Sequence, residues 1–149
     1  MAERDIRYQG AIIRDDRILL IKHREHESGR SYWLFPGGGI ESGEKEEDCV
    51  IREMKEETDL EVRVVSLIME EPDHPDGLYR LLKTYLCESD KGEASPGFEP
   101  EAEAASWYGI TEVKWFDLSD ETGWDTELIT DPKTYAHLQR VRNKLGYLP

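Results

Sequence analysis

Three glutamates, Glu53, Glu56 and Glu57, stand three and four residues apart in a stretch without proline. Because residues at i, i+3 and i+4 share one face of an α-helix, a helix here would gather their carboxylates, and like charges on one turn repel each other. Mg²⁺ takes hard oxygen ligands and usually binds through one or two carboxylates together with substrate phosphates. The spacing therefore indicates a divalent-metal site, and we expect the side chains around it to face solvent.

Three consecutive glycines, Gly37–Gly39, lie directly upstream of these carboxylates. Glycine has no side chain, so the backbone can turn tightly and approach a ligand closely. Ser42 is a candidate N-cap for the helix that follows. Val50 and Met54 stand at i and i+4 and give that helix an apolar stripe to bury. The stretch predicts a glycine turn that leads into a packed, carboxylate-bearing helix.

The alternative interpretation is a solvated acidic helix with local ion pairs, such as Asp48 with Arg52. A glycine triplet has no evident role next to such a helix, so we favour the metal site. Within the acidic run we expect Glu46, Glu47 and Asp48 to be solvated.

The spacing from Gly38 through Glu44 and Arg52 to Leu60 resembles the Nudix box of the MutT/Nudix hydrolases. That pattern is G-x5-E-x7-R-E-U-x-E-E-x-G-U, where U is a bulky aliphatic residue. Every fixed position matches except the last glycine, which is Asp59 here. Position 59 would follow the helix in the left-handed region, which Asp tolerates better than most residues. We expect the turn to survive with a modest loss of stability, because a negative charge lies at the negative end of the helix dipole.

The resemblance implies a role for each matching residue. The cofactor is Mg²⁺, with Mn²⁺ as the alternative ion, and the implied metal ligands are Glu53, Glu56, Glu57 and a backbone carbonyl at Gly37 or Gly38. Glu44 and Arg52 belong to the catalytic set with these glutamates. If the helix begins near Glu44, the two residues lie about two turns apart and do not pair directly. If Glu44 lies in the loop, it can fold back onto Arg52.

A further glutamate is expected from the long stretch 88–106, which has no clear helix or strand pattern. A loop of this length in a compact domain is usually functional or disordered. In the family, a glutamate from a loop after the box joins the metal site or acts as base. Glu99, in Gly97-Phe98-Glu99, matches that context best, and Glu101 and Glu103 are substitutes.

Candidates for substrate contact lie before the glycines. The segment 22–30 is locally basic, and one or two of its side chains could meet substrate phosphate, although no spacing selects them: Lys22, His23, Arg24 and Arg30. We take Arg24 and Arg30 as candidates. Trp33 fits either the core or a pocket wall that faces a base, and it is the third candidate.

The elements that position these residues follow from hydrophobic periodicity and turn residues. Asp15-Asp16 separates two β-rich runs and predicts a hairpin with a two-residue turn. Turn residues at 70–77 separate a second pair of strands. Asp131 and Pro132 read as N-cap and first residue of a last helix that ends at Gly146. The predicted strands are 7–14, 17–23, 31–36, 60–69, 78–87 and 107–118, and the apolar face of the last helix is Tyr135, Leu138, Val141 and Leu145.

The order of these elements predicts an α/β fold in which a mixed β-sheet is sandwiched between α-helices, an α/β/α layering. The resemblance implies the Nudix fold. The chain has 149 residues, which is enough for a substantial core, so we expect a single domain over residues 1–149.

Composition limits the partners and the compartment. Lys and Arg total 19 against 33 Asp and Glu, a formal charge of −14. Such a charge repels a nucleic acid polymer, whereas a small anionic nucleotide can bind where a metal and a few cations screen the field. Cys49 and Cys87 lie among apolar residues and read as buried thiols in a reducing interior. No apolar leader or membrane span is evident, so a cytoplasmic location without membrane contact is expected.

The resemblance implies a Mg²⁺-dependent Nudix pyrophosphohydrolase that cleaves a nucleoside diphosphate linked to another moiety. The substrate could be a nucleoside triphosphate such as oxidised dGTP, or an ADP-ribose-like nucleotide sugar. The alternatives are a Nudix-fold sensor that binds a nucleotide without turnover, and an acidic protein that only binds divalent cations. The complete set of box carboxylates argues against the sensor. A homodimer stays open, because dimers are common in the family.

Overall fold

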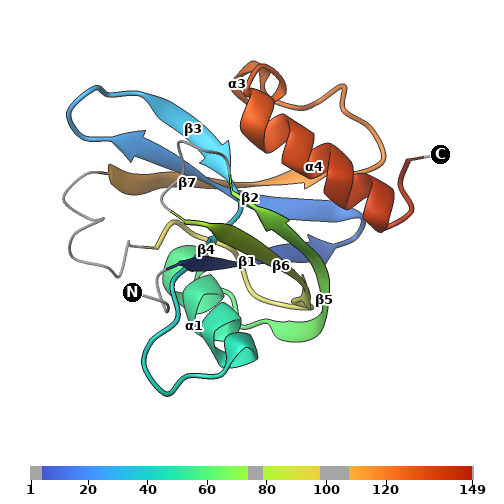
Figure 1. The fold of residues 1–149 in the computed structure, drawn as a ribbon. Coiled ribbons are helices and arrows are strands. Elements are labelled where there is room, and N and C mark those ends of the chain that lie inside the picture. Colours follow the sequence, from blue (N-terminus) through green and yellow to red (C-terminus); the bar gives the residue numbers. More distant parts are fainter. Residues whose placement is uncertain (1–4, 74–78, 98–107, 149) are drawn as a thin grey trace.

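The computed structural model describes residues 5–73, 79–97 and 108–148, and Figure 1 shows a sheet that lies between helices. The strands are β1 (Ile6–Arg14), β2 (Arg17–Glu25), β3 (Ser31–Leu34), β4 (Gly37–Gly38), β5 (Arg63–Pro72), β6 (Leu81–Glu88) and β7 (Tyr108–Asp117). The helices are α1 (Glu46–Thr58), α3 (Thr126–Ile129) and α4 (Pro132–Lys144).

The sheet is mixed, as predicted. Its main path runs β3-β2-β1-β6-β5, with β4 paired to β1 and β7 paired to β2. Strands β1 and β6 are parallel, and the other pairs are antiparallel. A parallel pair needs a crossover connection, and α1 lies in the chain between these two strands.

Both predicted hairpins are present. Asp15 and Asp16 have φ of 51° and 60°, the left-handed pair that suits a two-residue turn between twisted strands. Strands β5 and β6 pair as the second hairpin. The predicted turn at 70–77 began too early, because β5 continues through Pro72.

Two cores lie on opposite faces of the sheet because successive strand side chains point to opposite sides. In β2, Ile18 and Leu20 pack with Leu138 of α4 in one cluster. Leu19 packs with Val50 and Met54 of α1 in the other. Figure 1 shows α1 below the sheet and α3 and α4 above it, so the predicted α/β/α layering is confirmed.

The last helix forms as predicted. The Asp131 carboxylate accepts hydrogen bonds from the backbone N–H groups of Lys133 and Thr134, at 3.0 and 3.3 Å. Gly146 has a φ of 88° just beyond the helix, the conformation that favours glycine there. The short helix α3 was not predicted, because four residues carry no periodic signal.

The first helix begins later than predicted. It starts at Glu46 with Lys45 in the N-cap position, so the assignment of Ser42 as N-cap was wrong. Its end was predicted correctly, because Asp59 caps it with a φ of 62°. Cys49 and Cys87 are free and buried, as expected. None of the helices in the described ranges is long and apolar enough to cross a membrane.

Candidate active site

Helix α1 buries two of its glutamates together with its apolar stripe. Glu53 and Glu57 both have an exposed fraction of 0%. The helix can approach the sheet this closely because Gly10 of β1 lacks a Cβ, which would lie 2.5 Å from the Met54 sulfur. The expectation that this face is open to solvent was therefore wrong, and only Glu56 is partly exposed.

Of the two glycines of β4, Gly38 makes room for the Glu53 carboxylate and Gly37 makes room for the backbone of β1. A Cβ on Gly38 would lie 2.5 Å from Glu53 Oε1, and a Cβ on Gly37 would lie 2.4 Å from the Tyr8 carbonyl oxygen. The Gly37 N–H donates to Glu57 Oε1 at 2.8 Å. The structure thus brings Glu53, Glu57 and the two glycines together, as the sequence predicted.

Arg52 organises the remaining carboxylates. Its Nε and Nη2 donate to the two oxygens of Glu44 at 2.8 and 2.9 Å, a bidentate pair of fixed geometry. Its Nη1 meets Glu53 Oε1 at 3.0 Å and Glu56 Oε2 at 3.1 Å. Glu44 lies in the loop before α1 and folds back onto Arg52, which was one of the two predicted arrangements. The alternative that paired Arg52 with Asp48 was wrong.

The charges around Arg52 do not balance. One guanidinium lies within 4.0 Å of four carboxylates, those of Glu41, Glu44, Glu53 and Glu56. The hydrogen bond from Arg52 lowers the pKa of Glu44. Burial raises the pKa of Glu56, since desolvation penalises the charged form.

This donor set fits a hard divalent cation in its chemistry, because buried carboxylate oxygens in excess of cations are what Mg²⁺ binds. Residues 5–73, 79–97 and 108–148 contain no group of three or more His, Cys, Asp or Glu side chains placed to hold a metal ion by themselves. Glu53 and Glu56 lie against Arg52 instead. The three loop glutamates proposed as a further ligand, Glu99, Glu101 and Glu103, lie outside the described residues.

The described chain before Glu99 packs against the end of α1. The Gly97 N–H donates to the Glu57 carbonyl at 3.0 Å, and the Ser95 N–H donates to the Thr58 carbonyl at 2.9 Å. Any side chain at position 97 would collide with the backbone, because a Cβ there would lie 1.7 Å from the Glu56 carbonyl oxygen. The segment that leads to Glu99 is therefore fixed to the helix that carries the candidate ligands.

Glu46 is not simply solvated, contrary to expectation. It accepts a hydrogen bond from the Tyr85 hydroxyl and another from Lys83 Nζ at 3.1 Å. The hydrogen bond from Tyr85 lowers the pKa of Glu46. This carboxylate joins the start of α1 to β6.

The structure separates the predicted substrate contacts. Trp33 is fully buried in the core and packs edge to face on Phe116 with ring centroids 5.1 Å apart. This confirms the core alternative, and the position does not support Trp33 as a substrate contact. Lys22 pairs with Glu127 at 2.8 Å, and His23 is buried. Arg24 is exposed, and Arg30 lies over the Tyr32 ring at 5.0 Å.

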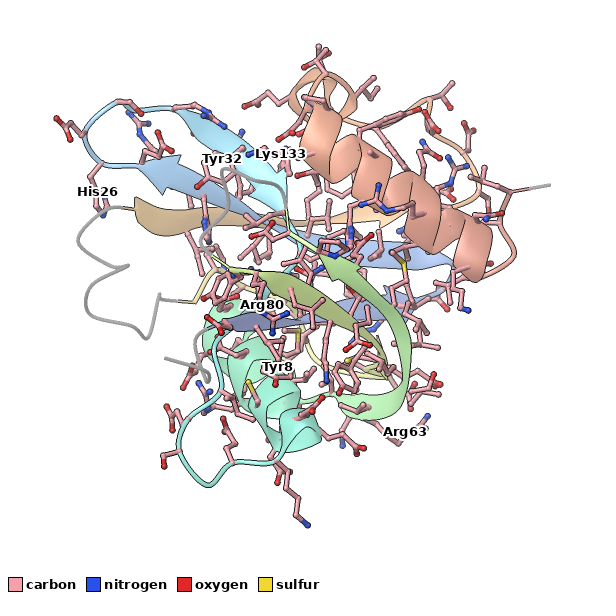
Figure 2. All side chains as sticks on the ribbon, in the orientation of Figure 1. Tyr8, His26, Tyr32, Arg63, Arg80 and Lys133 are labelled. Carbon is pink, nitrogen blue, oxygen red and sulfur yellow. The ribbon has the colours of Figure 1, made fainter. Side chains whose placement is uncertain are left out.

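Arg24 and Arg30 belong to the β2–β3 hairpin, whose turn contains His26. Figure 2 shows His26 at the far tip of that hairpin, well away from α1. The structure does not bring these two arginines to the carboxylates, and their contact with substrate stays a prediction.

Sequence reasoning missed a third arginine. Arg7 Nη2 donates to the Phe35 carbonyl at 2.8 Å, immediately before the glycine turn. Arg7 lies in a predicted strand and outside the Nudix-box spacing, so nothing in the sequence predicted its hydrogen bond to Phe35.

Comparison with known proteins identifies the family. The NUDIX domain model matches residues 6–131. The chain is 32% identical over 104 residues to the NAD-capped RNA hydrolase NudC of Vibrio parahaemolyticus, covering 69% of this chain and 38% of that protein. It is 32% identical over 113 residues to the ADP-ribose pyrophosphatase of Methanocaldococcus jannaschii, covering 74% of this chain and 60% of the relative.

A solved structure extends the likeness to the fold. The MutT NUDIX hydrolase from Burkholderia pseudomallei superposes with a TM-score of 0.63 at 29% identity, over 91% of this chain and 96% of that one. The chain therefore belongs to the Nudix family. It spans less than two thirds of the length of either curated relative above.

Proposed function

We propose that this protein is a Mg²⁺-dependent Nudix hydrolase that cleaves the diphosphate of a nucleoside diphosphate linked to another moiety. The observation that carries the proposal is the pair of fully buried carboxylates, Glu53 and Glu57. Gly38 leaves no room for a Cβ beside Glu53, and the Gly37 N–H donates to Glu57. Buried charges are costly unless they are paired or bind a cation. A plain acidic helix gives no reason to place them there.

We propose separate roles for the residues of the site. Glu53, Glu56 and Glu57 are the proposed oxygen ligands, with Glu99 from the following loop as a further ligand or base. When bound there, Mg²⁺ would supply charge neutralisation for the diphosphate and activation of the attacking water. Arg52, fixed by Glu44, keeps the carboxylates in place, and phosphoryl transfer depends chiefly on such positioning and charge compensation. One water adds to phosphorus, the bridging P–O bond breaks, and two phosphate-terminated products leave.

For the substrate we propose a small nucleotide, either an ADP-ribose-like nucleotide sugar or an oxidised nucleoside triphosphate. The likeness to an ADP-ribose pyrophosphatase supports the first. The formal charge of −14 disfavours long polyanions, although one relative is named as a hydrolase of NAD-capped RNA. The two buried free thiols suit the reducing cytoplasm, which we propose as the compartment.

The test is a substrate panel with purified protein: ADP-ribose, NAD, NAD-capped RNA, and normal and oxidised dGTP, each with Mg²⁺, Mn²⁺ or EDTA. We expect a nucleoside monophosphate from at least one small substrate, and no product with EDTA. Glu47→Gln is a matched control for Glu57→Gln, because Glu47 is exposed on the same helix.

The outcomes separate the function classes. Binding of a nucleotide in calorimetry without any phosphate product would overturn the hydrolase and support the sensor. Cleavage of only the capped RNA would overturn the proposed substrate class. Mg²⁺ binding without nucleotide binding would support a simple cation binder.

A further inference from the structure

Two arginines hold the glycine turn from opposite ends. Arg52 Nη2 donates to the Gly39 carbonyl at 3.1 Å, and Arg7 Nη2 donates to the Phe35 carbonyl at 2.8 Å. Between these two carbonyls lie Gly38, which packs against Glu53, and Gly37, whose N–H donates to Glu57. Arg52 comes from α1 and Arg7 from β1, so the turn is held by both the helix and the sheet.

We propose that Arg7 is a positioning residue for the hydrolytic site and acts through the Phe35–Gly37 backbone on Glu57. The inference rests on the proposed function. It assigns a role to a side chain outside the Nudix-box spacing.

Arg7 is connected to Glu57 through the backbone of residues 35–37. Arg7 fixes the Phe35 carbonyl, and the Gly10 N–H fixes the next carbonyl, that of Pro36, at 3.0 Å. Because a peptide group is planar, fixing the Pro36 carbonyl also fixes the Gly37 N–H of the same group. That N–H is the donor to Glu57 Oε1 at 2.8 Å. The orientation of a proposed metal ligand therefore depends on this turn.

Arg7 itself is held by a neighbour in its own strand. Its Nε donates to Gln9 Oε1 at 3.3 Å, and Gln9 is only 4% exposed. The Gln9 amide nitrogen lies 2.9 Å from Thr84 Oγ1 and 2.8 Å from His137 Nε2. Both neighbours are buried, so Gln9 is fixed in the orientation that presents its oxygen to Arg7.

His137 carries this network into α4. Its Nδ1 lies 2.5 Å from Glu71 Oε1 of β5, and its ring packs edge to face on the Phe35 ring with centroids 4.4 Å apart. The residue whose carbonyl Arg7 holds is thus also fixed through its side chain. The network lies on the α4 side of the sheet and supports the turn from the face opposite α1.

The competing explanation is that Arg7 only stabilises β1. Global stability would then fall, whereas the exchange of the Gly37 amide in folded protein and the turnover rate would not change selectively. A hydrogen bond from a charged group is strong enough for its loss to change a local equilibrium by about tenfold or more. The two explanations therefore predict different readouts.

The experiment compares Arg7→Met with Arg63→Met. Arg63 is an exposed arginine with an ion pair to Glu88 at 2.7 Å, and Figure 2 shows it at the end of β5, away from the glycine turn. In metal-free protein, hydrogen exchange of the 37–40 amides should be about tenfold faster in Arg7→Met. With the substrate found in the panel, kcat should fall about tenfold or more while KM stays within about twofold. Arg63→Met should change neither.

Arg7→Lys keeps the positive charge but changes the geometry of the hydrogen-bond donors. If Arg7→Met does not fold, this second variant still tests the positioning role of Arg7. One ammonium can hold the Phe35 carbonyl but lacks the planar fork that also reaches Gln9, so we expect intermediate exchange and kcat. Unchanged exchange and kcat in a folded Arg7 variant would overturn the proposal. A rise in KM alone would also overturn it, because Arg7 would then bind substrate. If the wild type hydrolyses nothing, the proposed function fails, and the exchange measurement still tests Arg7.

Discussion

Replacing Gly38 with alanine should disable the site with little damage to the fold. The new Cβ would lie 2.5 Å from Glu53 Oε1 and 2.7 Å from its carboxyl carbon, whereas ordinary contact begins near 3.4 Å. The atoms in the way are the end of a side chain, which can rotate. Glu53 must therefore retreat by about 1 Å, a displacement of the size that can cost roughly a hundredfold in rate.

A hundredfold loss in kcat corresponds to about 2.7 kcal/mol in activation free energy. The stability cost should stay near the lower end of the roughly 1–3 kcal/mol typical of overpacking. Gly37→Ala should differ, because its Cβ would meet the Tyr8 carbonyl oxygen at 2.4 Å and the Gln9 Cα at 2.7 Å. Backbone atoms cannot rotate away, so this variant should lie at the upper end of that range.

The assay pairs initial hydrolysis rates with urea unfolding for Gly37→Ala, Gly38→Ala and Gly123→Ala. Gly123 is the matched control, because nothing lies within 4 Å of its Cβ position and its φ is outside the left-handed range. It should be neutral in both measurements. If Gly38→Ala keeps more than about half of the wild-type kcat, then Glu53 is not held in place by this glycine or is not needed for turnover.

Two further predictions concern stability. Burial lowers the pKa of His23 to about 3, and the positive charge of Arg7 adds to the shift. In the unfolded chain the pKa is about 6.5, so below that pH protonation favours the unfolded state. The free energy of unfolding should therefore fall by about 2 kcal/mol between neutral pH and pH 5. His23→Gln should remove that part of the pH dependence of urea unfolding, and an unchanged slope between pH 6.5 and 5 would contradict the assignment. Asp59→Gly should stabilise the protein by up to about 1 kcal/mol, because it relieves the left-handed backbone and the helix-end charge at the cost of an exposed pair with Lys55. A destabilised Asp59→Gly would show that Asp suits this turn better than expected.

Much of the fold could be predicted because its signals are local. Asp15-Asp16 between two apolar runs fixed the first hairpin, and Asp131-Pro132 fixed the start of α4. The apolar run within the predicted strand 17–23 is covered on both faces, with Ile18 and Leu20 in one core and Leu19 in the other. These features depend on residues close in sequence, so their pattern was sufficient.

The sequence predicted which carboxylates form the candidate site, but it did not predict that two of them are buried. The spacing of Glu53, Glu56 and Glu57 selected the carboxylates, whereas their charge suggested exposure. Glu53 and Glu57 are both buried: Gly38 of β4 leaves room for Glu53, and the Gly37 N–H donates to Glu57. These contacts between separate elements depend on tertiary packing. For Trp33 the sequence left both the core and a pocket wall open, and the packing of β3 in the sheet decides for the core.

The start of α1 shows a conflict between local and distant signals. Ser42 is a good N-cap by type, but Glu44 accepts two hydrogen bonds from Arg52 and one from the Glu41 N–H. These bonds keep residue 44 in the loop, and α1 begins at Glu46. A contact between residues eight positions apart therefore overrides a capping preference worth about 1 kcal/mol.

The most direct test of the central claim is the turnover of Glu57→Gln with Mg²⁺, measured beside its urea unfolding. Glutamine can still accept the hydrogen bond from the Gly37 N–H through its own oxygen, so the fold should persist, but it removes the charge that the cation needs. The account predicts a folded protein without detectable hydrolysis of the substrate that the wild type cleaves. Wild-type rates in the folded variant would contradict the assignment of the buried carboxylates as the metal site.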